Sequence, residues 1–141
     1  MTLREICVSD KETLAAAKDF GFTDGWNESM ITSAFNGGNF YGFIAEDNAA
    51  MGFVTYTQTV DFAEIADLFV FPDYRRKGIA VKLLGEVINA VKNAGKEKIF
   101  LEVRKGNLAA KNLYSKLGFT ELYERKKYYG DEDATVMVKE I

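Results

Sequence analysis

Apolar residues recur along this chain with two periods, and the switch between them outlines its secondary structure. Period-two alternation and short continuous apolar runs predict seven strands, at about residues 2–8, 40–46, 50–59, 63–70, 98–103, 119–125 and 134–139. Helical spacing bounded by capping residues and glycines predicts four helices, at about residues 10–20, 28–35, 77–94 and 108–117. Ser9 or Asp10 can cap the first helix, Asn107 caps the last, and Asp47-Asn48 supplies a hairpin turn.

The order of these elements predicts an α/β fold with a mixed sheet. The chain has one long crossover, from the strand at 63–70 through the helix at 77–94 to the strand at 98–103. Such a connection makes its two strands parallel, whereas hairpins make their neighbours antiparallel. We therefore expect a mostly antiparallel sheet with two central parallel strands and flanking helices.

Length and composition limit the class of protein. With 141 residues we expect a single domain over 1–141, and with 18 basic and 21 acidic residues the net charge is −3. No strong positive field therefore points to nucleic acid or to an anionic membrane. A single cysteine, Cys7, fits a reducing compartment, and the sequence has neither a signal peptide nor a membrane-spanning run. We expect a cytoplasmic protein.

The absence of histidine restricts the possible chemistry. Ser-His-Asp and Cys-His catalysis lack their usual base, and histidine-containing zinc sites lack their ligand. Any general base must be a carboxylate, a lysine, a tyrosine or a water.

A basic turn joins the strand at 63–70 to the helix at 77–94. Arg75, Arg76, Lys77 and Gly78 lie where the unpaired amides and the positive dipole of the helix start. Gly78 lets the backbone approach an anion closely. This turn predicts a local phosphate site, although a plain solvated loop has the same composition.

Residues 75–80, Arg-Arg-Lys-Gly-Ile-Ala, resemble the R/Q-x-x-G-x-G/A pyrophosphate loop of the GNAT superfamily of N-acetyltransferases. The predicted element order is also that of the GNAT fold, in which two central parallel strands splay apart around the cofactor's pantetheine arm. The resemblance implies acetyl-CoA as co-substrate, without a metal. It implies cofactor contacts from Leu68, Phe69, Val70, Arg75, Arg76, Lys77, Gly78, Ile79, Ala80, Asn107 and Tyr114.

The segment 101–107 resembles the L-E-V-R-x-x-N run of the ribosomal-protein alanine N-acetyltransferases, a GNAT subfamily. Period two leaves Glu102 on the strand face opposite Leu101 and Val103. A carboxylate in an apolar central strand is costly unless it is hydrated, paired or used. Glu102 is therefore either the general base or the partner of Arg104, two residues on.

The segment 112–119, Asn-Leu-Tyr-Ser-Lys-Leu-Gly-Phe, resembles the end of the A-x-x-L-Y-x-x-L-G-F signature of the superfamily. There the tyrosine lies beside the cofactor sulfur, so the resemblance implies that Tyr114 protonates or hydrogen-bonds the departing thiolate. Helical spacing by itself fits a core tyrosine equally well.

Two aromatic segments carry the likeness to the subfamily. Trp26 and Glu28 lie where those enzymes have P-W-S-E, and Tyr128 and Tyr129 lie where they have a Y-Y hairpin. In the family both line the peptide groove, although ordinary edge packing explains exposed aromatics too. Gly25 replaces the proline, and the loop after Tyr129 is shorter than in the type member.

The resemblance implies an enzyme that moves acetyl from acetyl-CoA directly to the α-amine of a protein N-terminus, with a ribosomal protein as one candidate. The alternatives are a GNAT acting on a small-molecule amine and a non-catalytic acyl-CoA-binding module. We expect a monomer or weak dimer.

Overall fold

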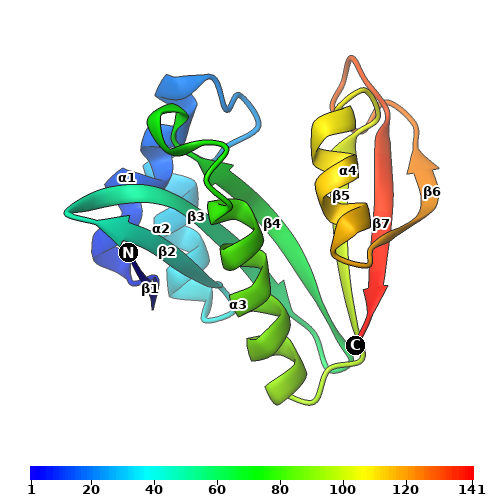
Figure 1. The fold of residues 1–141 in the computed structure, drawn as a ribbon, viewed down its shortest axis with the longest axis horizontal. Helices are drawn as coiled ribbons and strands as arrows, with labels where there is room; N and C mark the ends of the chain where they lie inside the picture. The colour runs from blue at the N-terminus through cyan, green and yellow to red at the C-terminus, as the bar shows by residue number, and fades with distance from the viewer.

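The computed structural model describes all 141 residues around one seven-stranded sheet (Figure 1). Its strands are β1 (Thr2–Glu5), β2 (Tyr41–Asp47), β3 (Ala49–Gln58), β4 (Phe62–Val70), β5 (Lys98–Arg104), β6 (Thr120–Arg125) and β7 (Ala134–Glu140). They are ordered β1-β2-β3-β4-β5-β7-β6, and only β4 and β5 pair in parallel. The predicted mixed, mostly antiparallel sheet is confirmed.

Four α-helices and three short 3-10 helices flank the sheet. They are η1 (Val8–Asp10), α1 (Lys11–Ala15), η2 (Ala16–Phe20), α2 (Glu28–Gly37), η3 (Pro72–Tyr74), α3 (Ile79–Asn93) and α4 (Leu108–Lys116). The helix predicted over 10–20 is thus half α-helix and half 3-10 helix. None of the helices has both the length and the apolar character that crossing a bilayer requires.

Two predicted boundaries were wrong. The first strand ends at Glu5 rather than Val8, because the Asp10 carboxylate accepts a hydrogen bond from the Cys7 backbone N–H at 2.8 Å and turns the chain. Asp10 is itself held by Arg4, so its side chain does not cap α1. The long helix begins at Ile79 rather than Lys77, because Gly78 before it adopts a left-handed conformation with φ 76°.

The two parallel strands separate soon after they meet. Their register covers only three residue pairs, Phe62–Glu64 of β4 against 98–100 of β5. Beyond Glu64 the strands diverge, as the green and yellow strands of Figure 1 show. The splay that the family resemblance implied is present, and it leaves one edge of β4 without a strand partner.

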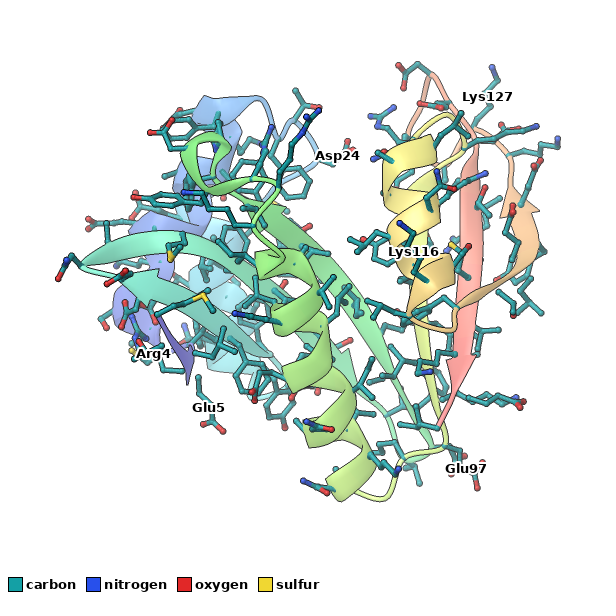
Figure 2. The ribbon with its side chains drawn as sticks, viewed as in Figure 1. Arg4, Glu5, Asp24, Glu97, Lys116 and Lys127 are labelled. Atoms are coloured by element: carbon teal, nitrogen blue, oxygen red, sulfur yellow. The ribbon has the colours of Figure 1, made fainter.

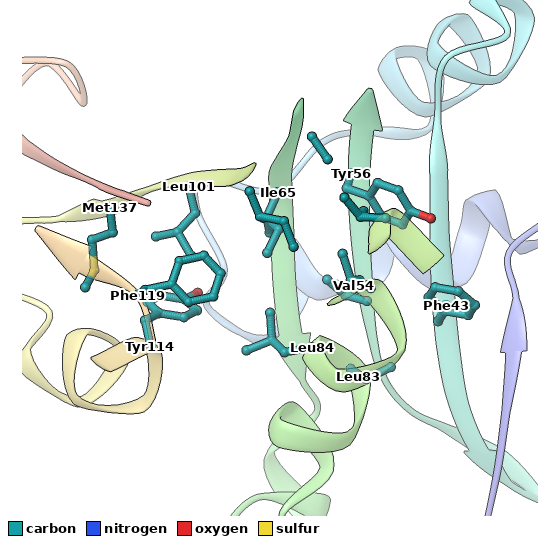
Figure 3. Packing of buried hydrophobic residues seen from close by; sticks show 14 of the residues in the cluster. Phe43, Val54, Tyr56, Ile65, Leu83, Leu84, Leu101, Tyr114, Phe119 and Met137 are labelled. Carbon is teal, nitrogen blue, oxygen red and sulfur yellow. The ribbon is translucent and has the colours of Figure 1, made fainter. Parts of the chain in front are cut away.

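Each face of the sheet is covered by a cluster of apolar side chains. On one face α3 packs with four fully buried residues, Leu83, Leu84, Val87 and Val91, onto β3 and β4. Tyr114 and Phe119 continue this cluster beside Leu101, across the gap from Ile65 and Leu84 (Figure 3). On the other face α1 and α2 cover a second cluster: Leu14, Ala17, Ile31, Phe40, Ile44, Phe53 and Phe69.

A β-bulge in β4 changes which side chains face which cluster. Thr55 of β3 pairs with Asp67, but the next residue, Tyr56, pairs with Ile65, so Ala66 is the extra residue. Ile65 packs in the α3 cluster, whereas Phe69 packs in the α1–α2 cluster. A bulge of this kind inverts the alternation of the strand beyond it. Asp67 therefore shares the face of Phe69.

Candidate active site

The space between the splayed strands is a cleft of about 1650 Å³ that is lined from both faces of the sheet. Small-molecule pockets usually measure a few hundred to about a thousand Å³. The cleft is therefore large enough for two substrates. Its lining includes the start of α3, the inner face of α4, β4, β5 and the loops at residues 20–26 and 128–129.

The basic turn forms an anion-binding loop at the start of α3. No side chain caps this helix, and the first N–H to bond within it belongs to Lys82, so the amides of Ile79, Ala80 and Val81 are free. Arg76 and Gly78 both have positive φ, 63° and 76°, which gathers backbone amides into a concave nest. This geometry suits a pyrophosphate.

The three cations of this loop have different surroundings. Arg75 Nε donates to the Val70 carbonyl at 2.8 Å, and the guanidinium lies over the Phe69 ring. Arg75 therefore holds the loop against β4. Arg76 lines the cleft, whereas Lys77 lies over the Tyr74 ring and is not part of the lining. Of the predicted cationic contacts, Lys77 is the one that the structure leaves outside.

The predicted pantetheine strand also lies in the cleft. Leu68, Phe69 and Val70 line it, on the part of β4 that has no partner in β5. Backbone groups on that edge are free to pair with amides of a ligand. Asn107 lines the cleft from the start of α4, where its side-chain oxygen accepts a hydrogen bond from the Ala110 N–H at 3.2 Å. Asn107 thus fixes the entry of the helix that carries Tyr114.

Tyr114 is both a core residue and a cleft residue. Its side chain is 8% exposed and packs edge-to-face on Phe119, yet it lines the cleft and its hydroxyl makes no hydrogen bond to protein. Burial, with a smaller contribution from the negative charge of Asp67, raises the pKa of Tyr114 to about 12. The hydroxyl therefore keeps its proton at neutral pH and can donate it to a hydrogen bond.

Glu102 lies on the face of β5 opposite the buried Leu101 and Val103, as predicted. Pairing with Arg104 was the wrong alternative, because the ion pair is instead with Arg125 of β6, Nη1 to Oε1 at 2.5 Å. The second oxygen of Glu102, Oε2, is buried and has no hydrogen-bond partner. A buried orphan acceptor in a cleft is available to a ligand.

Arg104 joins the two sides of the cleft mouth instead. Its guanidinium forms a two-point pair with Asp24, at 2.9 Å for both hydrogen bonds, and also pairs with Asp131 and Glu132 of the β6–β7 loop. Figure 2 labels Asp24 on the loop before α2 and Lys127 on the β6–β7 loop, on opposite sides of this mouth. These carboxylates raise the pKa of Arg104 above its ordinary value.

The aromatic segments come together as expected, with one exception. Trp26 stacks on Phe40 and lines the cleft from one side. Tyr128 and Tyr129 line it from the other, under the guanidinium groups of Arg125 and Arg104 respectively. The exception is the predicted substrate contact Glu28, which is exposed in the first turn of α2 and outside the cleft lining.

Sequence reasoning did not single out Asp67, one of several carboxylates besides Glu102 that line the cleft. Asp67 of β4 lines it from the same face of the sheet as Glu102. The carboxyl group takes part in no hydrogen bond or ion pair, and the backbone N–H of Asp67 donates to the Thr55 hydroxyl at 3.2 Å. The signal was a single charge within the otherwise apolar residues 65–70 of β4, where no motif marked it.

These features are typical of enzymes that bind the pyrophosphate of a CoA-type cofactor at the start of a helix and the acceptor in the gap between two splayed strands. A sequence model of the Acetyltransferase (GNAT) family matches residues 7–119. The chain therefore belongs to the GNAT family of acetyltransferases, and it is an acetyl-CoA-dependent acyltransferase.

Among its relatives is the ribosomal protein bS18-alanine N-acetyltransferase of Escherichia coli, which is 37% identical over 79% of this chain and 78% of its own length. The crystal structure of that Escherichia coli enzyme superposes with a TM-score of 0.90 at 29% identity, covering 99% of this chain and 93% of that one. The structure of Arabidopsis thaliana NAA60 in complex with acetyl-CoA has a TM-score of 0.86 at 23% identity, covering 99% and 98%.

Proposed function

We propose that this enzyme acetylates the α-amine of a protein N-terminus, with a ribosomal protein as the first candidate. The observation that carries the proposal is the acceptor side of the cleft. There Arg104 ties the Trp26 loop to the Tyr128-Tyr129 hairpin through Asp24 and Asp131, which makes an aromatic entrance suited to one chain end. The likeness to an enzyme named for the alanine of bS18 supports the same acceptor.

Acetyl-CoA occupies the other side of the cleft in this proposal. The free amides at the start of α3 and Arg76 hold the pyrophosphate, and the unpaired edge of β4 holds the pantetheine arm. Backbone N–H groups near Leu68 polarise the thioester carbonyl, which develops negative charge during attack. Holding both substrates in one cleft supplies a large part of the rate.

The acceptor must attack as a neutral amine. Reference pKa values of about 7.7 to 8 for an α-amine and about 10.4 for lysine make the neutral α-amine several hundred times more available near pH 7. A carboxylate base therefore suffices. Glu102, whose Oε2 has no protein partner, removes the proton that the nitrogen loses as the new bond forms, directly or through a water.

Tyr114 assists the leaving group. The pKa of this phenol is about 12, whereas a thiol has a pKa near 8.5, so full proton transfer to the thiolate is uphill. Tyr114 therefore stabilises the thiolate by a hydrogen bond. Transfer is direct in this scheme, since Cys7, the one thiol, is exposed at the start of η1 and outside the cleft lining.

A small-molecule amine is the second candidate acceptor. Asp24, Glu64, Asp67 and Glu102 are among the carboxylates that line the cleft, and such a site attracts a multiply charged amine. Arg104 pairs with Asp24 and Arg125 pairs with Glu102, so part of this negative charge is compensated, which favours an acceptor with few positive charges. The protein N-terminus fits this balance better than a polyamine.

The test is competition between acceptors. Peptides that begin with alanine and contain an internal lysine, with a free or a formylated amino terminus, are incubated with acetyl-CoA and spermidine and analysed by mass spectrometry. We expect acetyl on the free terminus alone. Acetyl mainly on lysine or on spermidine would overturn the proposal. We place the reaction in the cytoplasm, with the enzyme as a monomer or weak dimer.

A further inference from the structure

One titratable group in the cleft has no role in the scheme above. Asp67 lies on β4 directly before Leu68, whose backbone is assigned to the thioester carbonyl, so their Cα atoms are about 3.8 Å apart. The bulge at Ala66 places the carboxyl group of Asp67 on the same face of the sheet as Glu102, away from the core under α3. Neighbouring residues of β4 thus carry this carboxyl group and the backbone assigned to the thioester.

The surroundings of Asp67 leave it without a partner. Lys18 of η2 is the nearest compensating charge, but its Nζ donates to the Gly25 carbonyl at 2.9 Å. Asp24 adds negative charge near Asp67, but its own carboxylate is paired with Arg104. Tyr114 of α4 is near enough for the charge of Asp67 to act on its pKa, and Glu102 lines the cleft from β5 with Arg125 as its partner.

Burial, and to a lesser extent the charge of Asp24, raises the pKa of Asp67 from 3.8 to about 7, while Lys18 opposes this. An ordinary carboxylate is too weak a base to take a proton from an ammonium group with a pKa near 8. A carboxylate with a pKa near 7 is matched to that donor and to a neutral working pH.

We propose that Asp67 is a catalytic residue of this enzyme: it binds the ammonium group of the acceptor and takes its first proton. The inference rests on the proposed function for the acceptor. The site then has two bases, one on each splayed strand, and each takes one of the two protons that an ammonium group must lose to become an amide.

The steps balance as follows. The ammonium gives one proton to Asp67 and becomes a neutral amine. Its nitrogen attacks the thioester carbon, so a carbon–nitrogen bond forms and the carbon–sulfur bond breaks, and CoA leaves as a thiolate beside Tyr114. The nitrogen passes its second proton to Glu102. One of the two protons reaches the thiolate, the other reaches solvent, and both carboxylates return to their starting state.

The test uses Asp67→Asn, which keeps the shape of the side chain and removes the base. kcat/KM for a peptide with a free amino terminus is measured from pH 6 to pH 9. At pH 7 only about a tenth of α-amines are neutral, so we expect a loss of about tenfold there, closing to within threefold by pH 9. Asp47→Asn, which makes the same change at an exposed residue of β2 outside the cleft lining, is the control and should follow the wild type.

A second acceptor separates catalysis from a structural effect. In an aminooxyacetyl peptide the terminal amine is already neutral at pH 7. Asp67→Asn and wild type should acetylate it at rates within threefold, whereas Glu102→Gln should slow both acceptors. Equal loss with both acceptors in Asp67→Asn, or wild-type activity of Asp67→Asn at every pH, would overturn the assignment.

The two proposals fail separately. If the wild type acetylates spermidine and no peptide, the proposed acceptor is wrong. The same comparison is then made with spermidine, where Asp67→Asn must still reduce kcat/KM at pH 7 for the role of Asp67 to hold. Affinity for acetyl-CoA, measured by calorimetry, should be the same in wild type and Asp67→Asn.

Discussion

Asp67 should lower the stability of the folded protein at neutral and alkaline pH. In the native state its side chain is partly buried and its carboxyl is unpaired, which raises the pKa from 3.8 to about 7. The folded chain thus binds this proton more tightly than the unfolded chain. By linkage, this group makes the free energy of unfolding fall as pH rises from about 4 to about 7, with no further change above that range.

The size of the effect follows from the pKa difference. Each pKa unit corresponds to about 1.4 kcal/mol, so a rise from 3.8 to about 7 gives an upper value of about 4 kcal/mol. The side chain is only partly inaccessible to solvent, which screens some of this cost. We expect Asp67→Asn to be about 2 to 4 kcal/mol more stable than wild type at pH 8, and equal to it at pH 4.

Urea unfolding at half-unit steps from pH 4 to pH 8.5 measures this difference without reference to activity. The gap between Asp67→Asn and wild type should open between pH 4 and pH 7 and then stay constant. Glu64→Gln, on an exposed position of the same strand, should show no such opening. A gap that does not change with pH, or that favours the wild type at pH 8, would refute the burial argument.

Three further predictions concern the cofactor loop, the phenol and the cleft mouth. Gly78→Glu should weaken acetyl-CoA binding in calorimetry at least tenfold more than Gly78→Ala, since both substitutions strain the left-handed φ but only the glutamate adds negative charge. Equal affinities of the two variants would show that the pyrophosphate does not bind at this loop. Tyr114→Phe should lower kcat by roughly ten- to ten-thousandfold with an unchanged urea midpoint, because only a hydroxyl without a protein partner is lost; an unchanged kcat would return Tyr114 to a purely structural role. Arg104→Met should raise KM for the peptide severalfold while the Kd of acetyl-CoA stays the same, because it separates the two aromatic segments; a change confined to acetyl-CoA binding would contradict this.

Local sequence determined the elements and the cofactor side of the cleft. The amphipathic stripe of α3, the left-handed glycine before it and the Asn107 cap of α4 are all short-range features, and the structure has each of them. The loop and α4 also carry motifs that occur together in the GNAT family. Because each contact in this part joins residues near in sequence, the pattern was sufficient to place them.

Tertiary structure decided the acceptor side. Arg104 is only two residues from Glu102 in sequence, yet its partners are Asp24, 80 residues away, and Asp131, 27 residues away. Glu102 pairs instead with Arg125 of β6, which is separated from β5 by β7. Such pairings depend on where loops and strands meet across the sheet, and residue spacing carries no information about that.

The position of Asp67 shows the limit most clearly. Read with period two, Asp67 shares a face with Ile65 and falls in the core under α3, where an unpaired carboxylate would be very costly. One extra residue, Ala66, inverts the alternation, and the displaced N–H of Asp67 bonds to the Thr55 hydroxyl. The sequence by itself therefore determined that a charge sits in this strand. Only the register of β3 against β4, which depends on pairing along the whole length of both strands, determined that the side chain of Asp67 lines the cleft.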